Sequence, residues 1–383
     1  MRIPDFELEV FFGRHEFSAP YLLAQSDCEA LSIAELLVLE PDPAAAREAF
    51  LQTQLGYTEN DGRPELRRAI ARLYQGVTGD QVLVQTGAQE GIFSCCNVLL
   101  DKGDHLVCMF PAYQSLYEVA RSVGCDVSFW RFRQTARGWV LDFDELESLL
   151  RPDTRAIVIN SPHNPTGYAL SEAELRALCE LAARRGIRLI ADEVYKGLED
   201  PDGPDENAGR ARSSVCELYE RGVSIGVLSK AYGLPGLRIG WLASRDRETL
   251  TALSRFKNYL SICCATPSEE LALTALRHAP ALLARNRAIV RANLALADAF
   301  FARHAGLFIH NRPLAGPVGF HRLNIDGPAT EFCERLARQA GVLLLPGNVY
   351  GVDEPYFRMG YGRRNFGENL AHFEAWLAEA KLD

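Results

Sequence analysis

Short apolar, β-branched runs alternate with helical patterns through the middle of the chain, and this alternation limits the folds open to it. Six runs are predicted strands: 80–87, 104–110, 125–132, 155–160, 187–193 and 223–229. The segments between them include four predicted helices: 89–100, 113–124, 142–150 and 171–186. Such alternation is typical of an α/β fold, a mainly parallel sheet sandwiched by helices. Ligands bind such sheets beyond the carboxyl ends of the strands.

After Arg245 the pattern changes to that of a smaller α+β region. A long helical stretch at 268–304, interrupted once at Pro280, leads into this region. There we expect strands near 318–325, 342–345 and 355–361, and helices near 328–340 and 366–381. We expect a large domain at 45–275 and a small domain made of 1–44 and 285–383, joined by the helix at about 268–304, with the ligand site in the cleft between them.

The composition argues against several classes of protein. The 383 residues carry a formal net charge of −9 and no basic tract, so we expect no nucleic-acid partner. No apolar run approaches the roughly 20 residues that cross a bilayer, and the N-terminus lacks the pattern of a signal peptide. We therefore expect a cytoplasmic protein that binds no membrane. The ten cysteines and eight histidines show no disulfide or metal-ligand spacing, so we expect reduced cysteines and no metal site.

Three predicted strands end in polar residues. The turn NSPHNPTG (160–167) carries Asn164, the segment ADEVYKGL (191–198) carries Asp192 and Tyr195, and the run at 223–229 is followed by Lys230. Each feature alone has an ordinary interpretation: a turn, a helix cap, or a lysine that reaches solvent. Together they predict an amide, a carboxylate and an amine at one edge of a sheet.

These groups suit one cofactor. A lysine in a partly dry pocket has a lowered pKa, and its neutral amine can form a Schiff base with pyridoxal phosphate. A carboxylate keeps the pyridine nitrogen protonated, so that the ring accepts electrons. Arg238 is placed to pair with the phosphate, and the glycine turn QTGAQEG (85–91) offers a helix N-terminus to the same group.

In this order and spacing, the motifs NPTG, DE-x-Y, SK and RIG resemble class I/II aminotransferases, which are fold-type I pyridoxal-phosphate enzymes. Asp192 follows Asn164 by 28 residues and Arg238 follows Lys230 by eight, as in the family. The resemblance covers nearly the whole chain.

The resemblance implies a role for each residue of these motifs. Lys230 would form the internal aldimine and then move the proton of the substrate α-carbon. Asp192 would pair with the ring nitrogen, Asn164 and Tyr195 would contact the ring oxygen, and Tyr113 would stack on the ring. The phosphate would be bound by Gly87, Ala88, Gln89, Ser229 and Arg238. Many relatives carry Ser, Thr or Asn where this chain has Val227, so one phosphate contact is missing or supplied elsewhere.

Two further positions match the family. Tyr57 corresponds to a tyrosine that reaches the phosphate of the neighbouring subunit, which implies a homodimer with shared active sites. Arg358, in YFRMGYG, corresponds to the arginine that binds the substrate α-carboxylate, a task that suits its planar fork.

The N-terminal segment 13–37 resembles a subgroup that includes capreomycidine-synthase-like biosynthetic enzymes. In the family this segment lies over the substrate mouth, so His15, Glu16, Ser26 and Asp27 are candidates to meet the substrate side chain. Acidic residues there would suit a cationic side chain, and we identify no second arginine for an acidic one. A docking segment with solvated charges is the alternative interpretation.

The expected reaction is transamination between an L-amino acid and a 2-oxo acid. A lyase, cyclase or oxidase acting on an amino acid, for example one derived from arginine, is the alternative, because the fold does not fix the reaction. A non-catalytic ligand sensor is disfavoured because no basic DNA-binding module precedes residue 40. A nucleotide-binding enzyme is disfavoured because the chain lacks the glycine-rich loops of such proteins.

Overall fold

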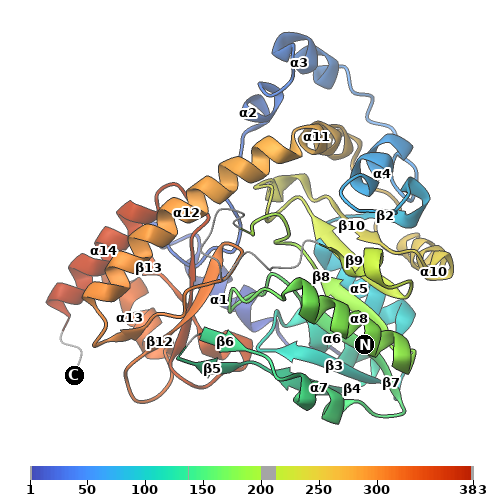
Figure 1. The fold of residues 1–383 in the computed structure, drawn as a ribbon. Coiled ribbons are helices and arrows are strands. Elements are labelled where there is room, and N and C mark those ends of the chain that lie inside the picture. Colours follow the sequence, from blue (N-terminus) through green and yellow to red (C-terminus); the bar gives the residue numbers. More distant parts are fainter. Residues whose placement is uncertain (1, 137, 200–212, 381–383) are drawn as a thin grey trace.

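A seven-stranded sheet forms the centre of the structure, a computed structural model that describes residues 2–136, 138–199 and 213–380 (Figure 1). In spatial order its strands are β2 (Val82–Gln85), β10 (Gly240–Ala243), β9 (Gly222–Val227), β8 (Arg188–Asp192), β7 (Thr154–Asn160), β3 (His105–Phe110) and β4 (Asp126–Arg131). Six of these strands match the predicted runs. The seventh, β10, was not predicted, and it runs antiparallel to both of its neighbours.

Helices cover both faces of this sheet because successive strand residues point to opposite sides. In β3, Leu106 and Cys108 belong to one apolar cluster, whereas Val107 and Met109 belong to another. The first cluster contains residues of α5 (Ala88–Leu99), α6 (Ser115–Val123) and α10 (Arg247–Lys257). The second contains residues of α7 (Phe143–Leu149), α8 (Glu172–Arg185) and α9 (Val215–Leu218). The predicted mainly parallel sheet sandwiched by helices is confirmed.

Local sequence signals fix the ends of α8. The Ser171 hydroxyl accepts a hydrogen bond from the Glu174 N–H, and the Glu174 carboxylate accepts one from the Ser171 N–H. This capping box satisfies two N–H groups that the first helical turn leaves unpaired. At the other end Gly186 has a φ of 65°, a left-handed conformation that glycine adopts without steric cost.

A second, antiparallel sheet forms the smaller α+β region. Its strands are β11 (Phe308–Ile309), β12 (Val318–Leu323), β15 (Tyr356–Gly360) and β14 (Leu345–Pro346), and α13 (Thr330–Ala340) and α14 (Phe366–Glu379) pack beside it. Two short pairs complete the sheets: β1 (Tyr21–Leu22) with β13 (Val342–Leu343), and β5 (Arg133–Thr135) with β6 (Gly138–Val140). The N-terminal segment therefore pairs with a strand more than 300 residues away in the chain.

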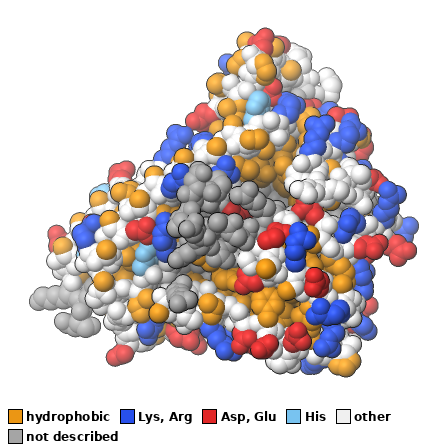
Figure 2. Space-filling model, viewed as in Figure 1, with side chains coloured by type: hydrophobic (Ala, Val, Ile, Leu, Met, Phe, Trp, Pro, Cys, Tyr) orange, Lys and Arg blue, Asp and Glu red, His pale blue; other side chains and the backbone are white. Residues whose placement is uncertain are grey.

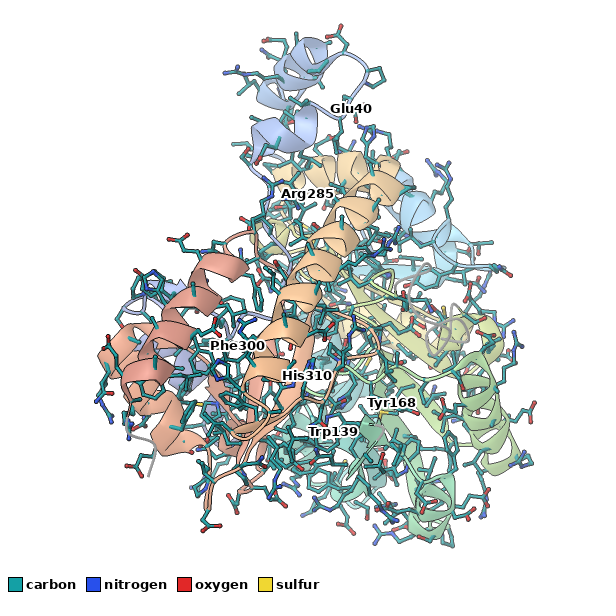
Figure 3. All side chains as sticks on the ribbon, turned by 60° about the vertical axis from the view of Figure 1, so that its left-hand side comes forward. Glu40, Trp139, Tyr168, Arg285, Phe300 and His310 are labelled. Carbon is teal, nitrogen blue, oxygen red and sulfur yellow. The ribbon has the colours of Figure 1, made fainter. Side chains whose placement is uncertain are left out.

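The predicted helix at 268–304 is two helices, α11 (Thr266–Arg277) and α12 (Ala279–Arg303). The break lies at His278, and Pro280 lies in the first turn of α12, where its missing N–H leaves no hydrogen bond unmade. Figure 3 shows α12 running from Arg285, near the segment that carries Glu40, toward Phe300 and His310 beside the second sheet. The division of the chain into two domains stays a prediction.

Four helices before residue 75 were not predicted: α1 (Glu7–His15), α2 (Ile33–Leu37), α3 (Pro43–Leu51) and α4 (Pro64–Ala71). We call α2 and α3 together the arm, which projects from the body at the top of Figure 1. In Figure 2 apolar side chains gather at the base of the arm, while charges of both signs are scattered over this face. The described part of the chain also contains three 3₁₀ turns: η1 (Gly79–Gln81), η3 (Pro235–Leu237) and η4 (Gly347–Tyr350). Among the described helices, none combines the length and apolar character of a membrane span.

Glycines let the N-terminal segment lie directly against the end of β15. The Gly360 N–H donates to the Leu23 carbonyl at 2.7 Å. A Cβ at Gly360 would lie 1.8 Å from the Gln25 carbonyl oxygen, and one at Gly362 would lie 2.1 Å from that of Asp27. Backbone atoms cannot move aside cheaply, so only glycine permits this contact.

We therefore expect Gly360→Ala to destabilise the protein by about 2 kcal/mol, because its methyl group displaces the segment around Gln25. Urea denaturation measures the loss. Gly306→Ala is the matched control, because a Cβ there meets no atom within 4 Å. Equal stability of the two variants would contradict the close contact.

Candidate active site

A cavity of about 340 Å³ lies at the carboxyl edge of the large sheet. Of the residues predicted for the site, those that line it are Glu16, Ser26, Asp27, Ala88, Gln89, Tyr113, Asn164, Asp192, Tyr195, Ser229, Lys230, Arg238 and Arg358. Gly87 and Tyr57 do not line it. Gly87 lies behind the cavity against Arg238, and Tyr57 is 91% exposed on the side of another cavity.

Strand direction explains why these residues meet. The parallel strands β7, β8 and β9 end just before or at Asn164, Asp192 and Lys230, so their polar residues share one edge. The antiparallel strand β10 begins at that same edge, where Gly240 pairs with Val227 and Gln85. Arg238, two residues before β10, is thereby brought to the cavity.

Lys230 lies in the cavity with its amine held by a hydroxyl. Its Nζ donates to the Ser26 Oγ at 2.9 Å, and the side chain is half-buried. Loss of water around the amine lowers the pKa of Lys230, and Arg358 acts in the same direction, against the carboxylates of Asp27, Glu9 and Asp192. This favours a neutral, nucleophilic amine, as expected from the sequence.

Asp192 is buried, with 5% of its surface exposed. Its Oδ1 accepts a hydrogen bond from the Val194 N–H at 3.2 Å. Burial raises the pKa of Asp192 to about 7; the Val194 bond and the charge of Lys230 oppose this shift, and Glu193 adds to it. A positive group placed beside the carboxylate would restore its ionised form.

Arg358 is fully buried and bound to the far wall of the cavity. Its Nε donates to the Ala24 carbonyl at 3.2 Å, its Nη1 donates to the Asn164 Oδ1 at 3.0 Å, and Nη2 also bonds the Ala24 carbonyl. The Tyr350 hydroxyl accepts from Nη1 and donates to the same Asn164 oxygen at 2.9 Å. Tyr350 was not predicted, because it lies in η4, away from the strand ends of the large sheet.

The N-terminus of α5 forms an anion-binding cradle. Gly87 precedes the helix with a φ of 83° and offers no side-chain cap, so the first N–H groups of α5 remain available beside Ala88 and Gln89. A Cβ at Gly87 would lie 2.5 Å from Arg238 Nη2. Arg238 itself has a φ of 53°, unusual for a residue with a side chain, and its Nη1 donates to the Ser229 Oγ at 3.4 Å.

Tyr113 and Gln89 are held by neighbours at the cavity wall. The Tyr113 ring lies 4.9 Å from that of Phe6, and its hydroxyl points to the Glu9 carboxylate at 3.5 Å. The Gln89 amide donates to the Ser115 hydroxyl at 2.6 Å. Contact with α1 thus orients the aromatic ring that was predicted to stack on the cofactor.

One face of α1, together with Glu16 just after the helix, lines the cavity. Glu9, Phe12 and Glu16, spaced three and four residues apart, all line it. Glu9 and Phe12 were not predicted, although their spacing with Glu16 is the signal that finds them once α1 is recognised as a helix. Asp27 and Ser26 line the cavity as expected. His15 does not line it and packs on Phe11 instead, with ring centroids 4.7 Å apart.

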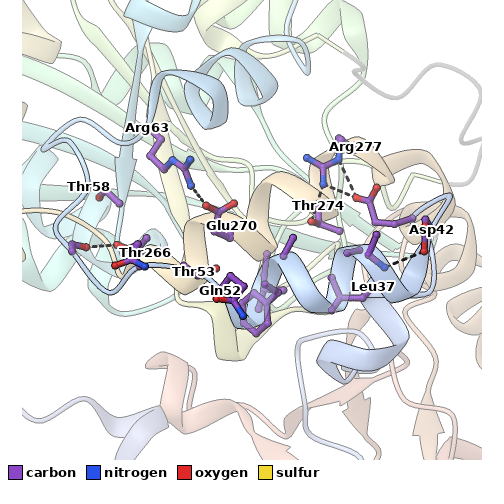
Figure 4. Close-up of a pocket in the computed structure, with 18 of the residues that line it drawn as sticks. Leu37, Asp42, Gln52, Thr53, Thr58, Arg63, Thr266, Glu270, Thr274 and Arg277 are labelled. Carbon is purple, nitrogen blue, oxygen red and sulfur yellow. Dashed lines mark hydrogen bonds and ion pairs between the residues drawn. The ribbon is translucent and has the colours of Figure 1, made fainter.

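A larger cavity of about 920 Å³ lies between the arm and α11 (Figure 4). Ion pairs cross its walls, Arg63 with Glu270 and Arg277 with Glu40, as the dashed lines in Figure 4 mark. None of the residues predicted to carry the chemistry lines it, apart from the proposed subunit-bridging Tyr57. We therefore place the chemistry in the smaller cavity.

The burial of Asp192 predicts a pH-dependent stability for the cofactor-free protein. In the unfolded chain the carboxyl group ionises near pH 3.8, whereas in the folded chain it stays protonated until about pH 7. The folded state therefore loses stability as pH rises through this window, by roughly 4 kcal/mol in all. Asp192→Asn keeps the acceptor for Val194 and removes the titration.

We expect the Asp192→Asn protein to be more stable than wild type at pH 8, with the difference shrinking toward pH 4. Urea denaturation across this range measures it. Asp326→Asn, which changes an exposed carboxylate, is the control and should leave the profile unchanged. A constant difference between the Asp192 variant and wild type at all pH values would refute the buried titration.

The comparisons with known proteins agree with this geometry. The sequence profile of aminotransferase class I and II matches residues 26–370. Capreomycidine synthase of Streptomyces vinaceus is 30% identical over 351 residues, which cover 91% of this chain and 87% of the synthase.

Two solved structures are similar over nearly the whole fold. A PLP-dependent aminotransferase from Streptococcus suis superposes with a TM-score of 0.92 and 31% identity, with all of both chains covered. The PLP-dependent cyclase OrfR has a TM-score of 0.86 and 31% identity, with 99% of this chain and 98% of the cyclase covered. The fold is thus the fold-type I architecture expected from the sequence.

The residues in the cavity fit pyridoxal phosphate. The uncapped N-terminus of α5 and Arg238 suit the phosphate, and the Lys230 amine suits the aldehyde. Within the described residues the buried Asp192 carboxylate forms no ion pair, and a pyridinium nitrogen would provide one. With this donor set and a profile match over most of its length, the chain belongs to the class I and II aminotransferases, enzymes that use pyridoxal phosphate as cofactor.

Proposed function

We propose that the protein is an aminotransferase that moves the amino group of an L-amino acid to a 2-oxo acid. The observation that carries this proposal is the arrangement of Lys230, Asp192 and Arg358 around one cavity. It provides an amine, a carboxylate and a guanidinium, which are the groups that this reaction requires. Pyridoxal phosphate, when bound, supplies the aldehyde and the electron-accepting ring.

The protein residues orient the substrate and move its proton. Arg358 binds the α-carboxylate and thereby holds the α-carbon toward Lys230, whose Nζ removes the α-proton. Asp192 would hold a proton on the ring nitrogen of the bound cofactor, and Asn164 and Tyr195 would donate to its ring oxygen. Asn164 also accepts from Arg358, so it links the cofactor site to the carboxylate site.

The remaining charges at the mouth favour a cationic or uncharged substrate side chain. Once Lys230, Arg238, Asp192 and Arg358 are assigned, the carboxylates of Glu9 and Glu16 remain beside the space for the side chain, together with the ion pair of Arg363 and Asp27. Carboxylates there attract a cation and repel an anion. The half-buried Phe12 between them adds an aromatic face on which a guanidinium or ammonium group can lie.

A lyase, cyclase or oxidase acting on such an amino acid is the second candidate. The similarity to capreomycidine synthase and to the cyclase OrfR supports it, since both relatives match this chain at 30–31% identity over nine-tenths of its length or more. These reactions use the same groups and differ in the steps after the proton is removed. The cytoplasmic location stays a prediction.

A panel of single amino acids separates the two candidates. We expect the holoenzyme to convert a donor with a cationic side chain, such as L-arginine, into its 2-oxo acid and to transfer the amino group to pyruvate or 2-oxoglutarate. Mass spectrometry of both products measures the transfer with ¹⁵N-labelled donor. Lys230→Ala should lower turnover by at least about a thousandfold, because it removes the group that moves the proton.

The position of the ¹⁵N label after the reaction distinguishes the two candidate reactions. Nitrogen-15 in the new amino acid supports transamination, whereas ammonia release, or a cyclic product that retains the label, supports the second candidate. Full turnover by the Lys230→Ala protein would contradict both, because each assigns the proton transfer to Lys230.

We propose further that the enzyme is a homodimer whose subunits share active sites. Tyr57 is exposed and does not line the cavity of its own chain, so its proposed contact with a phosphate requires a second subunit. Two residues shortly before it in the chain, Leu51 and Leu55, are also exposed and apolar. Burial of these side chains against a second copy would stabilise such a dimer.

Complementation tests the shared site. Lys230→Ala and Tyr57→Ala, each weak or inactive alone, should regain about half of wild-type turnover as a mixed dimer, because one of its two sites is then fully native. Differently tagged, co-expressed chains provide the mixed species. A mixed dimer no more active than its parents, or full activity of Tyr57→Ala alone, would contradict sharing.

A further inference from the structure

A second arginine lies in the active-site cavity, already paired with a carboxylate. Arg363 Nη2 donates to both carboxylate oxygens of Asp27, at 2.9 Å each. Both side chains line the cavity and are partly buried, with 28% of Arg363 and 13% of Asp27 exposed. The sequence patterns indicate Asp27 as a candidate substrate residue but do not indicate a second arginine. The structure supplies one, five residues after Arg358.

Arg363 is the cation that remains once the other cations of the cavity are assigned to the cofactor and to the substrate α-carboxylate. The charged residues that line the cavity are Glu9, Glu16, Asp27, Asp192, Lys230, Arg238, Arg358 and Arg363. In the proposed function the cofactor engages Lys230, Arg238 and Asp192, and the α-carboxylate engages Arg358. Among the cavity-lining residues Arg363 is therefore the one cation left to bind an acidic substrate side chain.

The carboxylate of Asp27 already pairs with the Arg363 guanidinium. It is a partner inside the protein for the group that would otherwise attract a second carboxylate of the substrate. The pairing leaves part of the guanidinium free, because within the described residues Nε and Nη1 of Arg363 make no hydrogen bond. An added carboxylate would meet free N–H groups but also the negative charge of Asp27.

The backbone holds both partners in place. A Cβ at Gly362 would lie 2.1 Å from the Asp27 carbonyl oxygen, so the two segments are in direct contact. The Asn293 amide donates to the Arg363 carbonyl at 2.7 Å and to the Tyr361 carbonyl at 2.9 Å. The pair is thus built into the fold, and its cost in side-chain entropy is small relative to that of an exposed pair.

We propose that Asp27 is a specificity-determining residue that masks Arg363 and so excludes substrates with acidic side chains. This inference rests on the proposed function, because it takes Arg358 as the site of the α-carboxylate. Removal of the Asp27 charge would expose Arg363 as a second carboxylate site and allow dicarboxylic ligands to bind. Asp27 and Arg363 then act as a matched pair, and the effect of changing one depends on the other.

Non-reacting acids test the mask. Calorimetry with the holoenzyme compares the straight-chain dicarboxylates of four to six carbons, succinate, glutarate and adipate, with butanoate, pentanoate and hexanoate. Members of each pair have the same chain length and differ by the distal carboxylate. The proteins are wild type, Asp27→Asn, Arg363→Gln and the double variant, each checked for an unchanged melting temperature.

We expect wild type to bind no dicarboxylate more tightly than its partner. Asp27→Asn should bind at least one dicarboxylate about tenfold to a hundredfold more tightly than wild type, with its monocarboxylate partner unchanged, because a charge-assisted hydrogen bond to Arg363 forms. The double variant should lose this gain, and Arg363→Gln alone should show none.

No gain for any dicarboxylate in Asp27→Asn, or a gain that persists in the double variant, would overturn the proposal. Equal gains for both members of a pair would do the same, since these indicate a general loss of negative charge near Arg358. The acids carry neither an amino nor an oxo group, so the result does not depend on turnover. If Asp27 blocks dicarboxylate binding in a protein that transfers no amino group, the result contradicts the proposed function but not the role of Asp27.

Discussion

Burial at the carboxyl edge of the large sheet disfavours the charged forms of the Asp192 carboxyl group and the Lys230 amine. It raises the pKa of Asp192 and lowers that of Lys230, so each tends toward its neutral form. Among the described residues, the Asp192 carboxylate accepts one hydrogen bond, from the Val194 N–H, and the Lys230 amine donates one, to the Ser26 hydroxyl. Pyridoxal phosphate offers the missing partners, a ring cation for the acid and an aldehyde for the amine. Cofactor binding should therefore stabilise the folded chain as well as equip it for catalysis.

The unpredicted strand β10 explains how a cation reaches this edge. A parallel strand at its position would start at the opposite edge of the sheet, far from the cavity. Because β10 is antiparallel, its first residue, Gly240, pairs with Val227 at the carboxyl end of β9. A Cβ at Gly240 would lie 2.7 Å from the carbonyl carbon of Gly87, so glycines allow the strand and the start of α5 to touch. The left-handed backbone of Arg238 then turns its guanidinium back toward Ser229.

Sequence patterns predict the parts of this site that come directly after buried strands. Asn164, Asp192 and Lys230 stand out because polar residues interrupt long apolar runs, and a parallel sheet must bring such ends together. Tyr350, Glu9 and Arg363 carry no such signal. Glu9 and Arg363 reach the cavity, and Tyr350 reaches Asn164 in its wall, through contacts between segments more than a hundred residues apart. The periodicity of α1 places Glu9 on one face of that helix but does not say which segment the face meets.

The same limit applies to the elements of the fold. Most of the long helices and buried strands were predicted, although α10, with eleven residues, was not. The strand β10 has four residues and α2 has five, too few for a periodic pattern. The break between α11 and α12 was placed near Pro280, two residues late, because proline fits the first turn of a helix better than the gap before it. Boundaries of this kind depend on capping and packing that one sequence does not reveal.

One short segment after β1 touches three of the four cations in the cavity. The Ala24 carbonyl accepts from Arg358, the Ser26 hydroxyl from Lys230, and the Asp27 carboxylate from Arg363. In the proposed function the strand ends of the sheet bind the cofactor, whereas Ala24 and Asp27 contact Arg358 and Arg363 on the substrate side. Ser26 contacts Lys230 itself, so within this segment Asp27 is the side chain whose change can alter substrate choice while Lys230 keeps its hydroxyl partner.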